Sequence, residues 1–215
     1  MRIGILGSGL MGGKLGRLFA RAGHDVVFSY SHDDKKLERL ARETGNGARA
    51  GSPAEAAEGA DAIMLAVHWS RLGDVLRKAG ALSGKVVVSC SLPMNKADSA
   101  LVVAHNSSGA EELAKRIPGA SVVSAFNTVP SEVLFSVFES RRRKVQPSLA
   151  YCGNSAKGKR VAARLIRDVG FEPVDAGPLR VARYLEPFAL LVAELAYSGK
   201  GNAKVAYQFR HYIRS

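Results

Sequence analysis

Three glycines follow a short apolar run at the start of the chain, in the sequence Gly7-Ser8-Gly9-Leu10-Met11-Gly12. The run from Met1 to Leu6 predicts a buried strand, and residues 11–22 carry a helical pattern. A G-x-G-x-x-G that ends a strand and opens a helix is far more specific than three glycines alone. The first glycine permits a tight turn, the second lets the backbone approach a phosphate, and the third lets helix and strand pack closely.

The helix that begins in this loop would point its free N–H groups at an anion. In dinucleotide-binding folds that anion is a pyrophosphate. The alternative is a glycine-rich turn without a ligand, which the strand–loop–helix context disfavours. We therefore predict a dinucleotide site formed by Gly7, Ser8, Gly9, Leu10, Met11 and Gly12.

The rest of the chain alternates short apolar runs with helical patterns, as in a parallel sheet covered by helices. Further strands are expected at residues 25–30, 61–67, 85–89, 121–126, 148–152 and 171–174. Helices are expected at residues 36–43, from 53, at 70–78, 108–116 and 156–169, and throughout from 179. The predicted fold is α/β, a doubly wound parallel sheet of the Rossmann type. It would span residues 1–177, with a small helical C-terminal segment, residues 178–215, packed on it.

The formal charge of the 215 residues is +12, from 31 Lys and Arg against 19 Asp and Glu. Such a charge indicates an anionic partner: nucleic acid, a membrane surface or a small molecule. The sharpest basic run, Arg141 to Lys144, has no interleaved aromatic residues, so nucleic acid is disfavoured and a solvated loop is the simpler interpretation. No apolar run approaches the ~20 residues of a membrane span, and no secretory leader is expected.

Only two cysteines are present, Cys90 and Cys152. They cannot form a disulfide framework, so a reducing, cytoplasmic location is expected. The histidines are scattered, and no metal site is predicted.

The second strand ends in the sequence Phe-Ser-Tyr-Ser-His, residues 28–32. It lacks the acidic residue that binds a ribose 2′-hydroxyl in NAD enzymes. Hydroxyl donors and positive charge for a 2′-phosphate are instead available from Ser29, Ser31, His32 and Lys35. Tyr30 is expected to contact the coenzyme as well. NADP(H) is therefore favoured over NAD(H). The alternative is a solvated turn in which Asp33 reaches back to a ribose hydroxyl.

Four stretches of the chain resemble the NADPH-dependent reductases of the deazaflavin coenzyme F420 and their bacterial dinucleotide-binding relatives. The same stretches are similar to the reductase domain of the STEAP ferric reductases. They are residues 1–12, 23–32, 122–130 and 175–180, the last continuing through 184–186. The third and fourth are the more specific, because few other Rossmann families pair A-F-N-T-V with D-A-G-P-L.

The resemblance implies NADP(H) as coenzyme and hydride transfer to a flat flavin or deazaflavin ring. The acceptor stays open between F420, FMN or FAD, and a ferric–flavin system. Ser31 and His32 would hold the 2′-phosphate. His32 stands where the family often has arginine, and a neutral imidazole is a poorer anchor than a guanidinium.

The nicotinamide half of the coenzyme would meet the loops that follow three further strands. The expected contacts are Val67, His68, Trp69, Ser91, Asn127 and Thr128. Relatives often have Pro-Trp where this chain has His68-Trp69. The alternatives are that Trp69 packs, that His68 is an exposed loop residue, and that Asn127 caps its own loop. Hydride transfer between stacked rings needs no side-chain nucleophile, so no catalytic residue is predicted.

A non-catalytic NADP(H)-binding, redox-sensing protein is the alternative function. A homodimer is also expected, because apolar residues cover more of the C-terminal helix than one core-facing stripe requires. These residues are Phe188, Leu190, Leu191, Val192 and Leu195.

Overall fold

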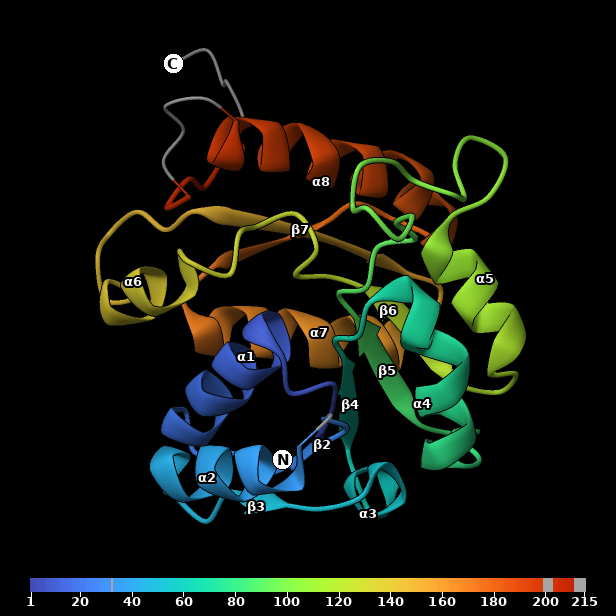
Figure 1. Ribbon diagram of the computed structural model, residues 1–215. Coiled ribbons are helices and arrows are strands. Elements are labelled where there is room, and N and C mark those ends of the chain that lie inside the picture. Colours follow the sequence, from blue (N-terminus) through green and yellow to red (C-terminus); the bar gives the residue numbers. More distant parts are fainter. Residues whose placement is uncertain (32, 199–202, 211–215) are drawn as a thin grey trace.

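The computed structural model describes residues 1–31, 33–198 and 203–210. Within these residues, eight strands form one sheet in the order β3-β2-β1-β4-β5-β6-β7-β8. Helices cover both faces (Figure 1). On one face lies a core that includes side chains of α1, α2, α6 and α7, and on the other a core that includes side chains of α3, α4 and α5.

The elements of the first half are β1 (Arg2–Leu6), α1 (Leu10–Arg21), β2 (Asp25–Ser29), α2 (Asp34–Thr44), β3 (Arg49–Ala50), α3 (Pro53–Ala57) and β4 (Ala62–Leu65). The middle of the chain forms η1 (Trp69–Arg71), α4 (Leu72–Ala79), β5 (Val86–Ser89), α5 (Gly109–Arg116), β6 (Ser121–Ser124) and α6 (Leu134–Glu139). The last elements are β7 (Ser148–Gly153), α7 (Ala156–Val169), β8 (Glu172–Asp175), η2 (Leu179–Val181) and α8 (Ala182–Tyr197).

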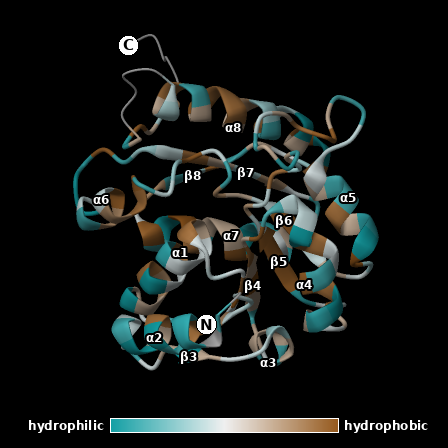
Figure 2. Ribbon diagram, viewed as in Figure 1, coloured by the Kyte–Doolittle hydropathy of each residue, from teal (hydrophilic) through white to brown (hydrophobic). Residues whose placement is uncertain are grey.

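The central strands are near-continuous apolar runs because both of their faces are covered. All residues of β4 and β5 are buried, as expected for parallel strands between two helical layers. In Figure 2 these strands are drawn mainly in brown, the hydrophobic end of the colour scale. The helix expected from residue 53 is α3, and a capping box of Ser52 and Glu55 starts it.

Strand order reverses beside β1, which pairs with β2 on one side and with β4 on the other. The carboxyl ends of β1 and β4 therefore lie together, with Leu6 in register with Leu65. Open α/β sheets bind their ligands in the crevice outside such a reversal. The phosphate loop leaves β1 at this point.

The sheet is not wholly parallel, which corrects one part of the prediction. β7 runs antiparallel to β6, with Val123 opposite Gly153 and Ser124 opposite Cys152. The connection between them contains only the six-residue helix α6 and does not cross the sheet. β7 therefore begins at the edge of the sheet where β6 ends. Because α7 then provides a full crossover, β8 lies parallel to β7.

The sequence predicts helix throughout from residue 179, and this prediction is wrong for the last part of the described chain. Residues 203–210 form no helix and lie beside β7 instead. The Ser148 N–H donates to the Tyr207 carbonyl at 2.8 Å, and the Phe209 N–H donates to Ser148 Oγ at 2.9 Å. Tyr207 and Phe209 alternate with the polar Gln208 and Arg210, the period-two pattern of extended chain.

The described ranges contain no helix that combines the length and apolar character needed to cross a membrane.

Candidate coenzyme site

The three glycines of the phosphate loop occupy different environments. A Cβ atom on Gly7 (φ +109°) would lie 2.4 Å from the Ala66 carbonyl oxygen, and one on Gly12 would lie 1.9 Å from the Gly7 carbonyl oxygen. The fold itself therefore requires these two glycines. A Cβ atom on Gly9 would meet nothing within 4 Å. The backbone at Gly9 faces open space, which is what a ligand's phosphates need in order to approach it.

The positive end of α1 faces this open space. Gly9 is the N-cap residue and supplies no side-chain cap, and the first turn carries no acidic residue. The N–H of Gly13 bonds to the Gly9 carbonyl at 2.9 Å, so the helical bonds begin there. The N–H groups of the preceding turn are thus available to an anion.

The loop is fixed to the end of β2 by three hydrogen bonds. The Gly7 N–H donates to the Ser29 carbonyl at 3.1 Å and the Ser8 N–H to the Tyr30 carbonyl at 3.3 Å. Ser8 Oγ donates to the Ser29 carbonyl at 2.9 Å. The Ser29 hydroxyl is buried and donates to the Ile5 carbonyl at 2.8 Å, so it joins the strands and does not face the predicted ligand space.

A cavity of about 320 Å³ runs beside the loop. It brings together the phosphate loop, the end of β2, the first turn of α2 and the segment after β4. Its lining residues are Gly7, Ser8, Gly9, Tyr30, Ser31, Lys36, Ala66, Val67, His68, Ser70 and Arg71. Leu10 is largely exposed, and Met11 packs against the core.

Tyr30 is a rigid wall of this cavity. Its backbone adopts the left-handed conformation, with φ 59°. Its hydroxyl donates to Asp74 Oδ2 on α4 at 2.8 Å, and the Lys78 ammonium lies 5.5 Å from its ring centroid. Burial, followed by the bond to Asp74, raises the pKa of the Tyr30 hydroxyl.

The structure favours Lys36 over Lys35 as the cation at this site. Lys36 lines the cavity, whereas Lys35 is exposed and lines none of the cavities described here. The sequence carried an indication of this in Asp33, a residue type that favours helix N-caps. In the structure Asp33 caps α2 and accepts the Lys36 N–H at 3.3 Å. That cap places Lys36 on the helix face turned toward the loop. His32 lies outside the described residues.

His68 and Trp69 have separate environments, because His68 is among the lining residues of the cavity and Trp69 is not. His68 Nδ1 accepts the Ser70 N–H at 3.2 Å and caps η1, while Nε2 lies 3.1 Å from Asp98 Oδ1. His68 therefore holds two loops together and also lines the cavity. Trp69 packs against the core, with the Arg116 guanidinium 5.3 Å from its ring centroid, which agrees with the packing alternative.

Asn127 carries an open hydrogen-bond acceptor in a buried position. Its side chain is 8% exposed, and its Nδ2 donates to Ser124 Oγ at 3.0 Å. Its Oδ1 has no partner among the described residues. The preceding Phe126 has φ 65°, a strained conformation of the kind found at ligand sites. A buried acceptor without a donor is costly unless a ligand supplies one.

Thr128 and Ser91 are less accessible than predicted. Thr128 is fully buried, and its hydroxyl lies 2.8 Å from the Tyr207 hydroxyl. Ser91 Oγ donates to the Val67 carbonyl at 2.7 Å. Both side chains connect neighbouring segments, and these contacts give their predicted role in coenzyme binding no support.

The surroundings of both cysteines disfavour the thiolate form. Cys90 and Cys152 are unpaired, and burial raises the pKa of each thiol to about 12. In the part of the chain that the structure describes, no group of three His, Cys, Asp or Glu residues could hold a metal ion.

Residues 2–93 match the family described as NADP oxidoreductase, coenzyme F420-dependent. Residues 2–93, slightly less than half of the chain, are therefore similar to that family. Members of the family are NADP-dependent oxidoreductases, so the resemblance predicted from the sequence is confirmed. Metalloreductase STEAP3 of Rattus norvegicus is 30% identical over 189 residues, which cover 88% of this chain and 36% of that protein. The chain thus spans about a third of the length of this curated relative.

Three solved structures share the fold. A candidate F420-dependent NADP-reductase from Arthrobacter sp. FB24 has a TM-score of 0.85 at 23% identity, covering 98% of this chain and 100% of that chain. The hypothetical protein SMa0349 from Sinorhizobium meliloti has a TM-score of 0.74 at 27% identity, covering 85% and 88%. Pyrroline carboxylate reductase of Plasmodium falciparum, solved with NADP bound, has a TM-score of 0.54 at 18% identity, covering 81% and 57%. The predicted α/β fold is confirmed.

Proposed function

We propose that this chain binds NADP(H) and transfers hydride between the coenzyme and a flavin-like acceptor. The acceptor class comprises F420, FMN or FAD, and a ferric–flavin system. The observation that carries the proposal is the open space over Gly9 at the uncapped, positive end of α1, with Lys36 lining the same cavity. The family and its NADP-dependent members support the same coenzyme.

The residues around the loop suit the coenzyme's phosphates. The N–H groups of the first turn of α1 would bind the pyrophosphate. The Ser31 hydroxyl and the Lys36 ammonium would hold the 2′-phosphate, since a phosphate prefers charge-assisted donors. Ser31 and Lys36 line one cavity, so one phosphate can engage both.

Val67 and Asn127 suit the nicotinamide half. Val67 offers an apolar wall beside the loop. The unpartnered Oδ1 of Asn127 would accept an N–H of the carboxamide and so fix which face of the ring is presented. When bound, NADPH supplies a hydride from its nicotinamide ring. The task of the chain is then to orient two rings and exclude water, which requires no side-chain nucleophile.

The test is to mix the protein with NADPH and, separately, with F420, FMN and FAD, and to follow the absorbance of the reduced nicotinamide. Oxidation with one acceptor is expected. Tight NADPH binding without oxidation by any acceptor would contradict the enzymatic proposal and favour the redox-sensing alternative.

We also propose that the protein is a homodimer. Tyr184, Leu191 and Leu195 are 66%, 54% and 60% exposed and lie on one face of α8. Of the other predicted residues, Val192 is buried and Phe188 and Leu190 are half-buried. A second copy that presents the same face could cover these side chains symmetrically. The two unpaired cysteines suit a cytoplasmic location, which we likewise propose.

A further inference from the structure

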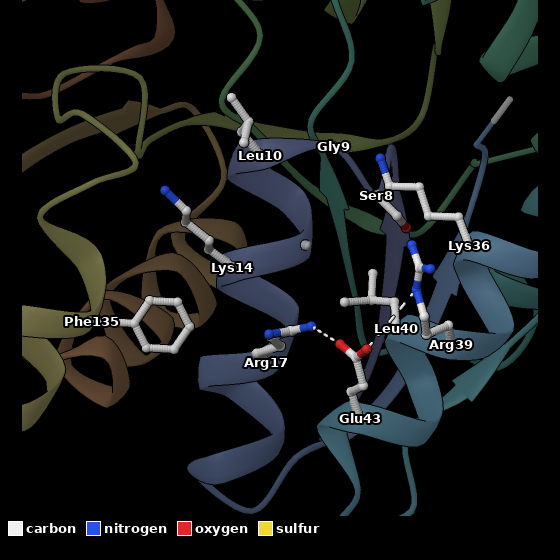
Figure 3. Close-up of a pocket in the computed structure, with 11 residues that line it drawn as sticks. Ser8, Gly9, Leu10, Lys14, Arg17, Lys36, Arg39, Leu40, Glu43 and Phe135 are labelled. Carbon is white, nitrogen blue, oxygen red and sulfur yellow. Dashed lines mark hydrogen bonds and ion pairs between the residues drawn. The ribbon is translucent and has the colours of Figure 1, made fainter. Parts of the chain in front are cut away.

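A second cavity, of about 470 Å³, lies between α1 and α2 and shares Ser8, Gly9 and Lys36 with the cavity described above. Figure 3 shows it from the side of the two helices. Apolar contacts come from Leu40 and from Phe135, which reaches in from α6. This second cavity, the α1–α2 cleft, therefore continues the candidate coenzyme cavity past Ser8 and Gly9 of the phosphate loop.

The charge of this cleft is strongly unbalanced. Four cations line it, Lys14, Arg17, Lys36 and Arg39, against the single carboxylate of Glu43. Coulomb repulsion makes such a set unfavourable unless an anion enters or the cations are engaged elsewhere. The partners of each cation therefore decide which of them can meet a ligand.

Two of the cations are already engaged. Lys14 Nζ donates to Ser131 Oγ at 2.9 Å. Arg17 makes the close ion pair with Glu43, at 2.5 Å. Neither is needed to explain an anion site, and both hold α1 against its neighbours.

Lys36 and Arg39 remain for a ligand. Lys36 has no side-chain partner within residues 1–31, 33–198 and 203–210. The contact of Arg39 in the same ranges is a long one, Nε to Glu43 Oε1 at 3.9 Å. The two cations are three residues apart on one face of α2, and Figure 3 shows both side chains extending toward Ser8. Glu43, held by Arg17, orients the Arg39 guanidinium without neutralising it.

We propose that Arg39 is a specificity-determining residue that, together with Lys36, binds the 2′-phosphate of NADP(H). This inference rests on the proposed function. The N–H groups at the N-terminal end of α1 would already bind the pyrophosphate. The two additional positive charges, on Lys36 and Arg39 of α2, therefore suit the 2′-phosphate, which NADPH has and NADH lacks. A planar guanidinium can donate two hydrogen bonds to a phosphate, which a flexible ammonium group cannot do in a fixed geometry.

The test is to measure dissociation constants for NADPH and NADH in wild type, Arg39→Ala, Arg39→Lys and Arg42→Ala. Arg42 lies on the same helix, is exposed and lines neither cavity, so it is the matched control for net charge. In Arg39→Ala we expect the NADPH constant to rise about tenfold, the size of one charge-assisted contact. The NADH constant should change less than about twofold. Arg39→Lys should lie between, and Arg42→Ala should match wild type.

An unchanged ratio of NADPH to NADH affinity in Arg39→Ala would overturn the inference and leave the proposed function standing. This includes an equal loss of affinity for both coenzymes, which would show that Arg39 has a structural role. Wild-type protein that binds neither coenzyme would overturn the proposed function and this inference together. Thermal unfolding of each variant shows whether it folds.

Discussion

A side chain at Gly12 would collide with the protein itself, whereas a side chain at Gly9 would collide only with a bound ligand. This difference gives a paired prediction. In Gly9→Ala the new Cβ meets no protein atom within 4 Å, so we expect stability to fall by about 1 kcal/mol or less. Coenzyme affinity should fall at least about tenfold, because the methyl group occupies the path of the phosphates. Gly12→Ala should lose about 3 kcal/mol of stability, because its Cβ would lie 1.9 Å from the Gly7 carbonyl oxygen.

Thermal unfolding and NADPH titration of the two variants measure these effects. Gly9→Ala that binds NADPH as wild type does would show that the open space at Gly9 is not the phosphate site.

Asn127 allows a prediction about one end of the coenzyme only. Asn127→Ala removes the unpartnered buried Oδ1, so we expect NADPH affinity to fall about tenfold. Affinity for 2′,5′-ADP, which lacks the nicotinamide ring, should not change. Calorimetric titration with both ligands checks this, and equal losses would mean that Asn127 maintains the loop and does not bind the carboxamide.

At the scale of single residues, the sequence predicted which loops surround the cavity better than it predicted which side chains point into it. Strand ends could be located, so the loops that surround the cavity were anticipated. Whether a side chain points into that cavity depends on contacts made by distant segments. Trp69 packs beneath Arg116, and Thr128 meets Tyr207, 79 residues away along the chain. Nothing in the local sequence indicates either contact.

At the scale of elements, α8 is joined to α5 by a buried carboxylate. Glu186 is 1% exposed, and its two oxygens accept the N–H groups of Gly109 and Ala110 at 2.8 and 3.0 Å. Arg183 adds a two-pronged ion pair to Glu111. These bonds satisfy the first N–H groups of α5 from a helix more than 70 residues away, which no capping rule for adjacent residues could predict.

The same contact gives a pH-dependent prediction. Burial raises the pKa of Glu186 to about 7, against the opposing effect of the two N–H bonds. Its unfolded-state value is about 4.5, so between pH 4.5 and 7 the folded state binds more protons. The free energy of unfolding of wild type, relative to Glu186→Gln, should therefore decrease as pH rises through this window and level off above it.

Urea unfolding of both proteins at several pH values measures this difference. A difference that grows with rising pH would show that the two N–H bonds outweigh the cost of burying the charge. Glu186→Ala should be less stable than wild type by about 2 kcal/mol, because two buried N–H groups lose their acceptors.

At the scale of the whole molecule, the charge of +12 separates into parts with different tasks. Lys36 and Arg39 line the cleft between α1 and α2. Arg141, the first residue of the basic run, stacks on Phe138 at 3.9 Å and donates to the Phe138 carbonyl at 2.7 Å, so it closes α6. The solvated-loop interpretation holds for the exposed Arg142 and Arg143. Composition predicts only that a partner is anionic, whereas the folded arrangement shows where the positive charge gathers.

The outward face of α8 gives the prediction for the assembled protein. Tyr184, Leu191 and Leu195 are exposed on a helix whose other side is buried, and such a continuous apolar stripe is unusual unless covered. We expect light scattering to give twice the mass of one 22.9 kDa chain. The double substitution Leu191→Glu and Leu195→Glu should give the single-chain mass, because two copies would then bury like charges against each other. Val102→Glu, at a 56% exposed apolar site outside α8, is the control and should remain dimeric. A wild-type protein of single-chain mass at micromolar concentration would contradict the dimer. The α8 variant should bind NADPH as wild type does, because all residues that line the candidate coenzyme cavity belong to one chain.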